Sequence, residues 1–94
     1  MTDHIISVAT IKAAGGVAAI EGFAAEYGGK VGPPKYRARK AADVALGFAI
    51  GFEDRVITLD NVDGRVVPVR SDDERRAAID RYVAIAAACE ILSL

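Results

Sequence analysis

The chain of 94 residues contains no tryptophan, only three phenylalanines and three tyrosines, and one residue each of cysteine, histidine and methionine. A single cysteine excludes an intramolecular disulfide framework and is typical of proteins in reducing compartments. A single histidine, His4, leaves no cluster with metal-ligand spacing, so we expect no metal and no cofactor. Alanine supplies much of the 52% apolar content. Because alanine buries little area, such a chain gains stability from close backbone packing or from self-association.

The chain also lacks a large net charge and a long apolar run. Its formal net charge is −1 and 27% of its residues are charged, which is typical of a globular protein of one domain, residues 1–94. Attraction to nucleic acid or to an anionic membrane must therefore be local. The first residues lack a basic signal-peptide region, and "YVAIAAAC" is too short to span a bilayer. We expect a soluble, cytoplasmic protein with no membrane contact.

The first 27 residues carry a helical spacing that is interrupted by two glycines. Small and apolar residues recur at intervals of three and four: Ile6, Ala9, Ala13, Gly16, Ile20, Phe23 and Tyr27. The stripe passes through Gly15-Gly16, which would cost about 2 kcal/mol relative to alanine inside one helix. The alternatives are one bent helix or two helical pieces, and the cost favours two pieces.

A second pair of glycines and two prolines punctuate the next stretch. Gly28-Gly29 predicts a helix end, and Pro33-Pro34 suits the start of the following helix. That helix would turn four residues inward: Ala41, Val44, Ala45 and Phe48. Its end is open, because "GFAIGFED" fits a helix, a turn or the entry to a strand.

The stretch "RVITLDNVDGRVVPV" predicts a β-hairpin over about residues 55–70, because two β-branched runs flank an Asp-Gly turn signal. We expect a four-residue loop at 61–64, with Asp60 opposite Arg65 and Leu59 opposite Val66. Pro68 cannot donate to a ladder, so its strand is expected at an edge.

A long helix over about residues 72–92 follows, because "SDDE" has the pattern of a capping box from Ser71 to Glu74. One stripe of this helix holds Ala78, Tyr82, Ile85, Cys89 and Leu92. Apolar residues also occupy much of the remaining surface, so we expect a homo-oligomer whose interface includes Tyr82, Val83, Ala86, Ala87 and Ile91. The fold class is α+β: two or three N-terminal helical segments, the hairpin and the long C-terminal helix. No internal repeat is evident.

The most distinctive segment is "YGGKVGPPKYRARK". Five basic residues fall within it with Tyr36 among them, and no acid follows before Asp43; the candidate site residues are Lys30, Lys35, Tyr36, Arg37, Arg39 and Lys40. The backbone N–H groups at a helix start already favour anions, so the cations predict a site for phosphate, nucleic acid, a nucleotide or an acidic protein surface. The alternative is a solvated helix face, although local helix stability favours acids at this end.

The sequence shows no pattern that is typical of a catalytic site. No serine or threonine follows the lysines of "GGKVGPPK", so a phosphate-binding P-loop is excluded. Cys89 lies within an apolar helical stripe, and none of Ser7, Ser71 and Ser93 has an evident histidine partner. In "DNVDG", Val62 stands where a calcium loop requires a carboxylate. We therefore expect no catalytic residues.

The segment "TIKAAGGVAAI" resembles the first turns of small phage repressors of the Cro type, over about 20 residues. The resemblance implies a DNA-binding helix-turn-helix whose recognition helix would begin with Lys35, Tyr36, Arg37 and Arg39. The chain departs from that pattern at "GGKVGPPKYR", which is longer than the tight turn of the motif and contains prolines.

These observations predict a small, non-enzymatic binding or regulatory protein with a basic patch at residues 30–40. Accessory proteins of phages and mobile elements, including inhibitors of bacterial defence systems, are often of this size and composition. One alternative is a protein–protein interaction module acting through the hairpin edge and the C-terminal helix. A second alternative is the helix-turn-helix repressor.

Overall fold

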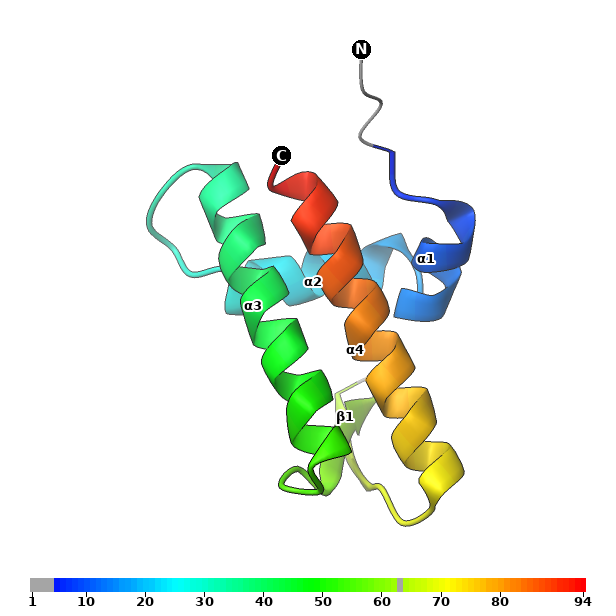
Figure 1. The fold of residues 1–94 in the computed structure, drawn as a ribbon. Coiled ribbons are helices and arrows are strands. Elements are labelled where there is room, and N and C mark those ends of the chain that lie inside the picture. Colours follow the sequence, from blue (N-terminus) through cyan, green and yellow to red (C-terminus); the bar gives the residue numbers. More distant parts are fainter. Residues whose placement is uncertain (1–4, 63) are drawn as a thin grey trace.

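A computed structural model describes residues 5–62 and 64–94 (Figure 1). Its helices and strands, in chain order, are α1 (Val8–Ala14), α2 (Val17–Tyr27), α3 (Pro34–Glu53), β1 (Leu59–Val62), β2 (Arg65–Pro68) and α4 (Asp72–Leu92). The strands pair as an antiparallel hairpin. The predicted α+β class is confirmed: three helices, a hairpin and a long C-terminal helix.

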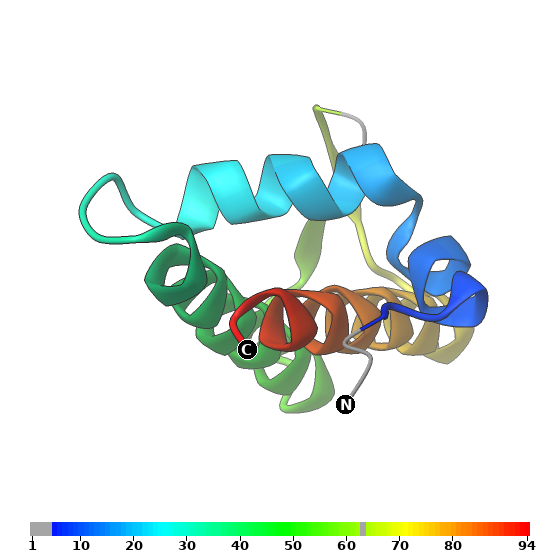
Figure 2. The same cartoon turned by 90° about the horizontal axis from the view of Figure 1, so that it is seen from above.

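The two long helices form the base of the molecule. α3 and α4 run antiparallel, side by side, and make the most extensive contact between any two elements (Figure 1). α2 crosses one face of this pair, the hairpin lies on the same side, and α1 packs against α4 (Figure 2). In the described part of the chain, no other helix or strand covers the opposite face of the pair.

The break between α1 and α2 falls at Gly15 and Gly16, so the prediction of two helical pieces is confirmed. Both glycines have positive φ, +100° and +107°, which residues with a Cβ rarely adopt. The N–H of Gly16 donates to the carbonyl of Ile11 at 2.8 Å and closes α1. The predicted stripe is therefore divided, and Ala14 is buried while Ala13 is exposed.

The bend between α1 and α2 also limits the length of continuous helix in this part of the chain. Among the described residues, no single helix is both long enough and apolar enough to cross a membrane. The pair α1 and α2, bent by 64°, meets the length and composition criteria only when its two helices are taken together.

The corner between α2 and α3 is tight. α2 ends at Gly28, whose N–H donates to the carbonyl of Ala24 at 2.9 Å, and Gly29 follows with φ of +76°. A Cβ on Gly28 would lie 2.8 Å from the carbonyl oxygen of Arg37, so the two backbones approach closely there. Pro34 is the first residue of α3, as predicted. The stretch left open above is helical as far as Glu53.

The core is built largely from alanines between α3 and α4, which let the two helices approach closely. Ala41 and Ala45 are fully buried, as predicted, and Phe48 is partly buried. Phe23, Phe48 and Phe52 gather around Tyr82, whose ring is stacked with that of Phe52 at 5.7 Å between centroids. The buried apolar set is Ala14, Ile20, Ala38, Ala41, Ala42, Ala45, Ala49, Phe52, Ala78, Ile79, Tyr82, Ala84, Ile85, Ala86, Ala88 and Cys89.

The hairpin forms where predicted but in a different register. Asp60 lies opposite Val67 and Val62 opposite Arg65, so the predicted pairs Asp60–Arg65 and Leu59–Val66 are wrong. Because Val62 pairs directly with Arg65, the connection is shorter than the four residues predicted, and Gly64 within it has φ of +79°. In this register Asp60 faces α4 and is 6% exposed.

The start of α4 is fixed by the capping box that the sequence predicts. The hydroxyl of Ser71 accepts a hydrogen bond from the backbone N–H of Glu74 at 3.0 Å. The carboxylate of Glu74 accepts from the N–H groups of Ser71 and Arg70 at 2.9 and 3.2 Å. At the other end, Leu92 is 46% exposed, so the predicted stripe is buried only as far as Cys89.

Candidate functional site

The basic segment, residues 30–40, lies at the exposed corner where the loop 28–33 enters α3 (Figure 1). The structure brings the six predicted residues to this one corner, and all of them are exposed: Lys30, Lys35, Tyr36, Arg37, Arg39 and Lys40. Four of these residues open α3, where the helix-turn-helix comparison placed a recognition helix.

The side chains of this corner are held by the glycines of the loop. The ring of Tyr36 packs on Gly32, where a Cβ would lie 2.8 Å from the ring. The Nε of Arg37 donates to the carbonyl of Gly32 at 3.1 Å. The ammonium of Lys40 lies 5.7 Å from the centroid of the Tyr36 ring. The loop and the first two turns of α3 therefore form one folded unit in which Tyr36 and Arg37 both contact Gly32 and Lys40 lies near the Tyr36 ring.

Few acids balance these cations. The first turn of α3 contains no acidic residue and its N-cap, Pro33, offers no side-chain hydrogen bond. Arg39 pairs with Asp43 at 3.9 Å, but both side chains are more than 60% exposed, so the pair is weak. The helix dipole and the side chains therefore produce a local positive potential that can hold phosphate or carboxylate groups.

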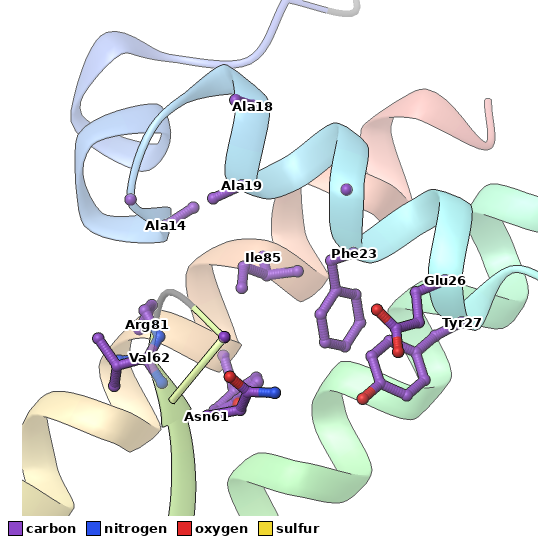
Figure 3. Close-up of a pocket in the computed structure, with 14 residues that line it drawn as sticks. Ala14, Ala18, Ala19, Phe23, Glu26, Tyr27, Asn61, Val62, Arg81 and Ile85 are labelled. Carbon is purple, nitrogen blue, oxygen red and sulfur yellow. The ribbon is translucent and has the colours of Figure 1, made fainter. Parts of the chain in front are cut away.

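A pocket of about 560 Å³ opens between α2 and the hairpin, with α4 as its floor (Figure 3). Small residues of α2, such as Ala18 and Gly22, leave the space that larger side chains would fill. Phe23 and Tyr27 supply aromatic walls. This volume is in the range of small-molecule sites.

A buried ion pair closes the hairpin side of the pocket. The guanidinium of Arg81 donates to Asp60 at 2.5 Å, and the hydroxyl of Tyr82 donates to the other carboxylate oxygen at 3.0 Å. Burial raises the pKa of Tyr82. Burial opposes the charged form of Arg81, but the hydrogen bond and charge of Asp60 outweigh it and raise the pKa of Arg81.

Among the described residues that line the pocket, the other charged one is Glu26, on α2 (Figure 3). Within the described ranges, no cation lies within 4 Å of its carboxylate. Because Arg81 is already neutralised by Asp60, the pocket suits an apolar or cationic small molecule better than an anion. Sequence reasoning missed this site, and the only sequence signal was a lone carboxylate, Asp60, within an apolar strand.

The residues predicted for an oligomer interface fall into two groups. Tyr82 and Ala86 are only 8% and 3% exposed within the single chain, because they face α3 and the core. Val83 is 46% exposed, and Ala87 and Ile91 are partly exposed. Of these five predicted residues, only Val83, Ala87 and Ile91 remain accessible to a second chain.

The residues considered for catalysis have structural roles. Cys89 is fully buried, and burial raises the pKa of its thiol. Ser7 and Ser71 cap helices. No group of three or more His, Cys, Asp or Glu side chains that could hold a metal occurs in the described part of the chain, and His4 lies outside it. The chain matches no protein-family model, no curated protein and no solved structure.

Proposed function

We propose that this protein is a non-enzymatic binding protein that holds the phosphate backbone of a nucleic acid with its basic segment. The observation that carries the proposal is the presence of five cations and Tyr36 at one exposed corner, with the ammonium of Lys40 5.7 Å from the centroid of the Tyr36 ring. Phosphate contacts supply most of the affinity of such proteins. The ring of Tyr36 is 54% exposed, and an aromatic ring beside cations can stack on an unpaired base.

The position of the cations supports a ligand rather than a solvated helix face. Cations at the start of a helix oppose its dipole, so they weaken α3 when no anion is bound. The side chains of Tyr36 and Arg37 are nevertheless ordered by contacts with Gly32. A bound phosphate would remove the unfavourable interaction and use the free N–H groups at the helix start.

The test is a titration of labelled single-stranded and duplex oligonucleotides at several salt concentrations. We expect the logarithm of the affinity to fall with the logarithm of salt, with a slope of about one per phosphate contact. The double variant Arg37→Ala with Arg39→Ala should abolish binding and leave the thermal midpoint unchanged. With no tryptophan in the protein, co-purified nucleic acid would also appear as excess absorbance at 260 nm.

The matched control is Lys12→Ala with Arg65→Ala, which removes the same charge from exposed positions outside the basic segment. If both double variants weaken binding equally, the attraction is general and the segment is not the site. Absence of any binding at about 50 mM salt would contradict the proposal. That result would favour an acidic protein surface or a nucleotide as the anionic partner.

A second candidate is a protein-interaction module that uses the hairpin. The sheet has only two strands, so each strand leaves one edge unpaired. Leu59 on β1 and Val66 on β2 are 55% and 67% exposed. An added strand from another protein would satisfy such an edge. The same titration separates the two, because this candidate predicts no affinity for either oligonucleotide.

A further inference from the structure

One side of the α3–α4 pair, opposite α2 and the hairpin, is left uncovered (Figure 2), and an ordered set of exposed and partly exposed residues of both helices lies there. We call this side the outer face. Its members on α3 are Arg39, Asp43, Leu46, Ile50 and Glu53, and on α4 they are Arg76, Asp80, Val83, Ala87 and Glu90. Leu46, Ile50 and Val83 are 43%, 61% and 46% exposed.

Both helices carry the same pattern on this face: Arg, Asp, two apolar residues and Glu, at intervals of four, three, four and three. That spacing keeps all five residues on one side of a helix. The residues between them differ, which is why the sequence shows no repeat. Because α3 and α4 are antiparallel, the two patterns run in opposite directions and resemble two halves related by a two-fold axis.

Ring contacts fix the relative level of the two patterns. The ring of Tyr82 contacts those of both Phe48 and Phe52, at 5.3 and 5.7 Å between centroids, so Val83 lies within about one helical turn of the level of Leu46. Along each helix from Leu46 and Val83, Arg39 and Glu90 lie toward one end of the face, and Glu53 and Arg76 lie toward the other. The face thus has an apolar centre and, at each end, one cation and one anion on different helices.

The two glutamates at the ends do not stabilise their own helices. Glu53 and Glu90 lie in the last turns of α3 and α4, and neither last turn contains a basic residue. The helix dipole favours cations there, so local stability predicts the opposite sign. A partner that brings cations to these positions accounts for the pattern.

We propose that the outer face is a two-fold interface with a second copy of this chain. If α3 lies over α4 of the copy, Arg39 faces the partner's Glu90 and Glu53 faces the partner's Arg76. If α3 lies over α3, Arg39 faces the partner's Glu53 and Arg76 faces the partner's Glu90. Both arrangements pair opposite charges at the ends and bring Leu46 and Val83 together at the centre. The proposal is argued from the outer face alone and does not rest on the proposed nucleic-acid binding.

The size of the face fits a modest dimer. A helix of 20 residues, such as α3, is about 30 Å long, and two adjacent helices are about 20 Å wide. The face therefore offers roughly 600 Å² per copy, at the lower end of stable interfaces. Buried alanines between α3 and α4, including Ala42, Ala49 and Ala86, allow these two helices to approach each other closely. We expect a dimer whose population depends on protein concentration.

The test is sedimentation equilibrium over a wide concentration series. Glu53→Arg places two like-charge contacts in either arrangement, so we expect the dimer dissociation constant to rise at least about tenfold. A cation at the end of α3 agrees with its dipole, so the variant should fold normally. The control Glu21→Arg makes the same reversal on α2, away from the outer face, and should leave dimerisation unchanged.

Compensating reversals identify the arrangement. Glu53→Arg with Arg76→Glu restores the dimer only if α3 lies over the partner's α4. Arg39→Glu with Glu53→Arg restores it only if α3 lies over α3. Leu46→Glu places a charge at the centre and should abolish the dimer in both. A wild-type protein that stays monomeric at the highest concentration overturns the proposal, and so does a dimer that survives Leu46→Glu.

Discussion

Replacing Asp60 by alanine removes the carboxylate through which β1 holds two side chains of α4. Asp60 is 6% exposed and accepts hydrogen bonds from Arg81 and Tyr82. Removing one member of a buried ion pair typically costs 3–5 kcal/mol, because the other charge is left without a partner. The Arg81 side chain keeps 26% of its exposure, so water can recover part of that loss. We therefore expect Asp60→Ala to destabilise the protein by about 3 kcal/mol.

Urea denaturation followed by far-ultraviolet circular dichroism measures this loss directly. In a domain of this size, about 3 kcal/mol corresponds to a fall of roughly 12–24 °C in the thermal midpoint. Tyr82→Phe deletes a single hydrogen bond to Asp60 and should cost only about 1 kcal/mol. The control Asp54→Ala removes an exposed carboxylate and should change stability by less than about 0.5 kcal/mol.

A double-mutant cycle decides whether the pair itself is responsible. If Asp60 and Arg81 stabilise each other, the double variant should be much less destabilised than the sum of the two single alanine variants. Two results would refute this reasoning: additive single effects, or a loss in Asp60→Ala no larger than in Asp54→Ala. Either would mean that the hairpin is held by its apolar contacts.

Two further predictions concern glycine and pH. Gly28→Ala should destabilise by about 1–3 kcal/mol, since its Cβ would lie 2.8 Å from the Arg37 carbonyl oxygen. Gly47→Ala, which meets nothing within 4 Å, should stabilise by up to about 1 kcal/mol; the same sign for both in urea denaturation would contradict this. Hydrogen bonds with Ser71 and the N–H of Arg70 lower the pKa of Glu74, so its contribution is present above its usual pKa and is lost as pH falls through the lowered value. The difference in thermal midpoint between wild type and Glu74→Gln should shrink in acid, and a constant difference would argue against it.

The features that sequence alone predicted are local ones. The break at Gly15-Gly16, the capping box at Ser71 and the start of α3 at Pro34 depend on backbone conformation or on contacts within one turn. The exposure of the basic segment followed from its composition. Each of these signals lies within a few residues, so no knowledge of tertiary packing was needed.

The features that sequence reasoning missed depend on contacts between distant segments. The shorter connection shifts the register by two residues and changes every cross-strand pair, and the sequence does not show that the side of β1 with Asp60 packs on α4. Tyr82 and Ala86 belong to the core because α3 packs against that side of α4. An apolar helix does not show which of its sides the same chain covers. The outer face likewise becomes visible only once α3 and α4 are placed antiparallel.

The two proposals meet at Arg39, which belongs both to the basic segment and to the outer face. An arginine that pairs with a carboxylate of a second copy is less available to a phosphate. Taken by itself, Arg39 therefore makes dimerisation and nucleic-acid binding oppose each other. The arrangement of the helices in the dimer makes a second contribution to the coupling between dimerisation and nucleic-acid binding. With α3 over the partner's α4, the basic segments of both copies lie at the same end and jointly attract one polyanion. With α3 over α3 they lie at opposite ends, and only the competition at Arg39 remains. The sign of the coupling between the two equilibria therefore reports the arrangement of the helices, because favourable coupling requires the basic segments to share one end.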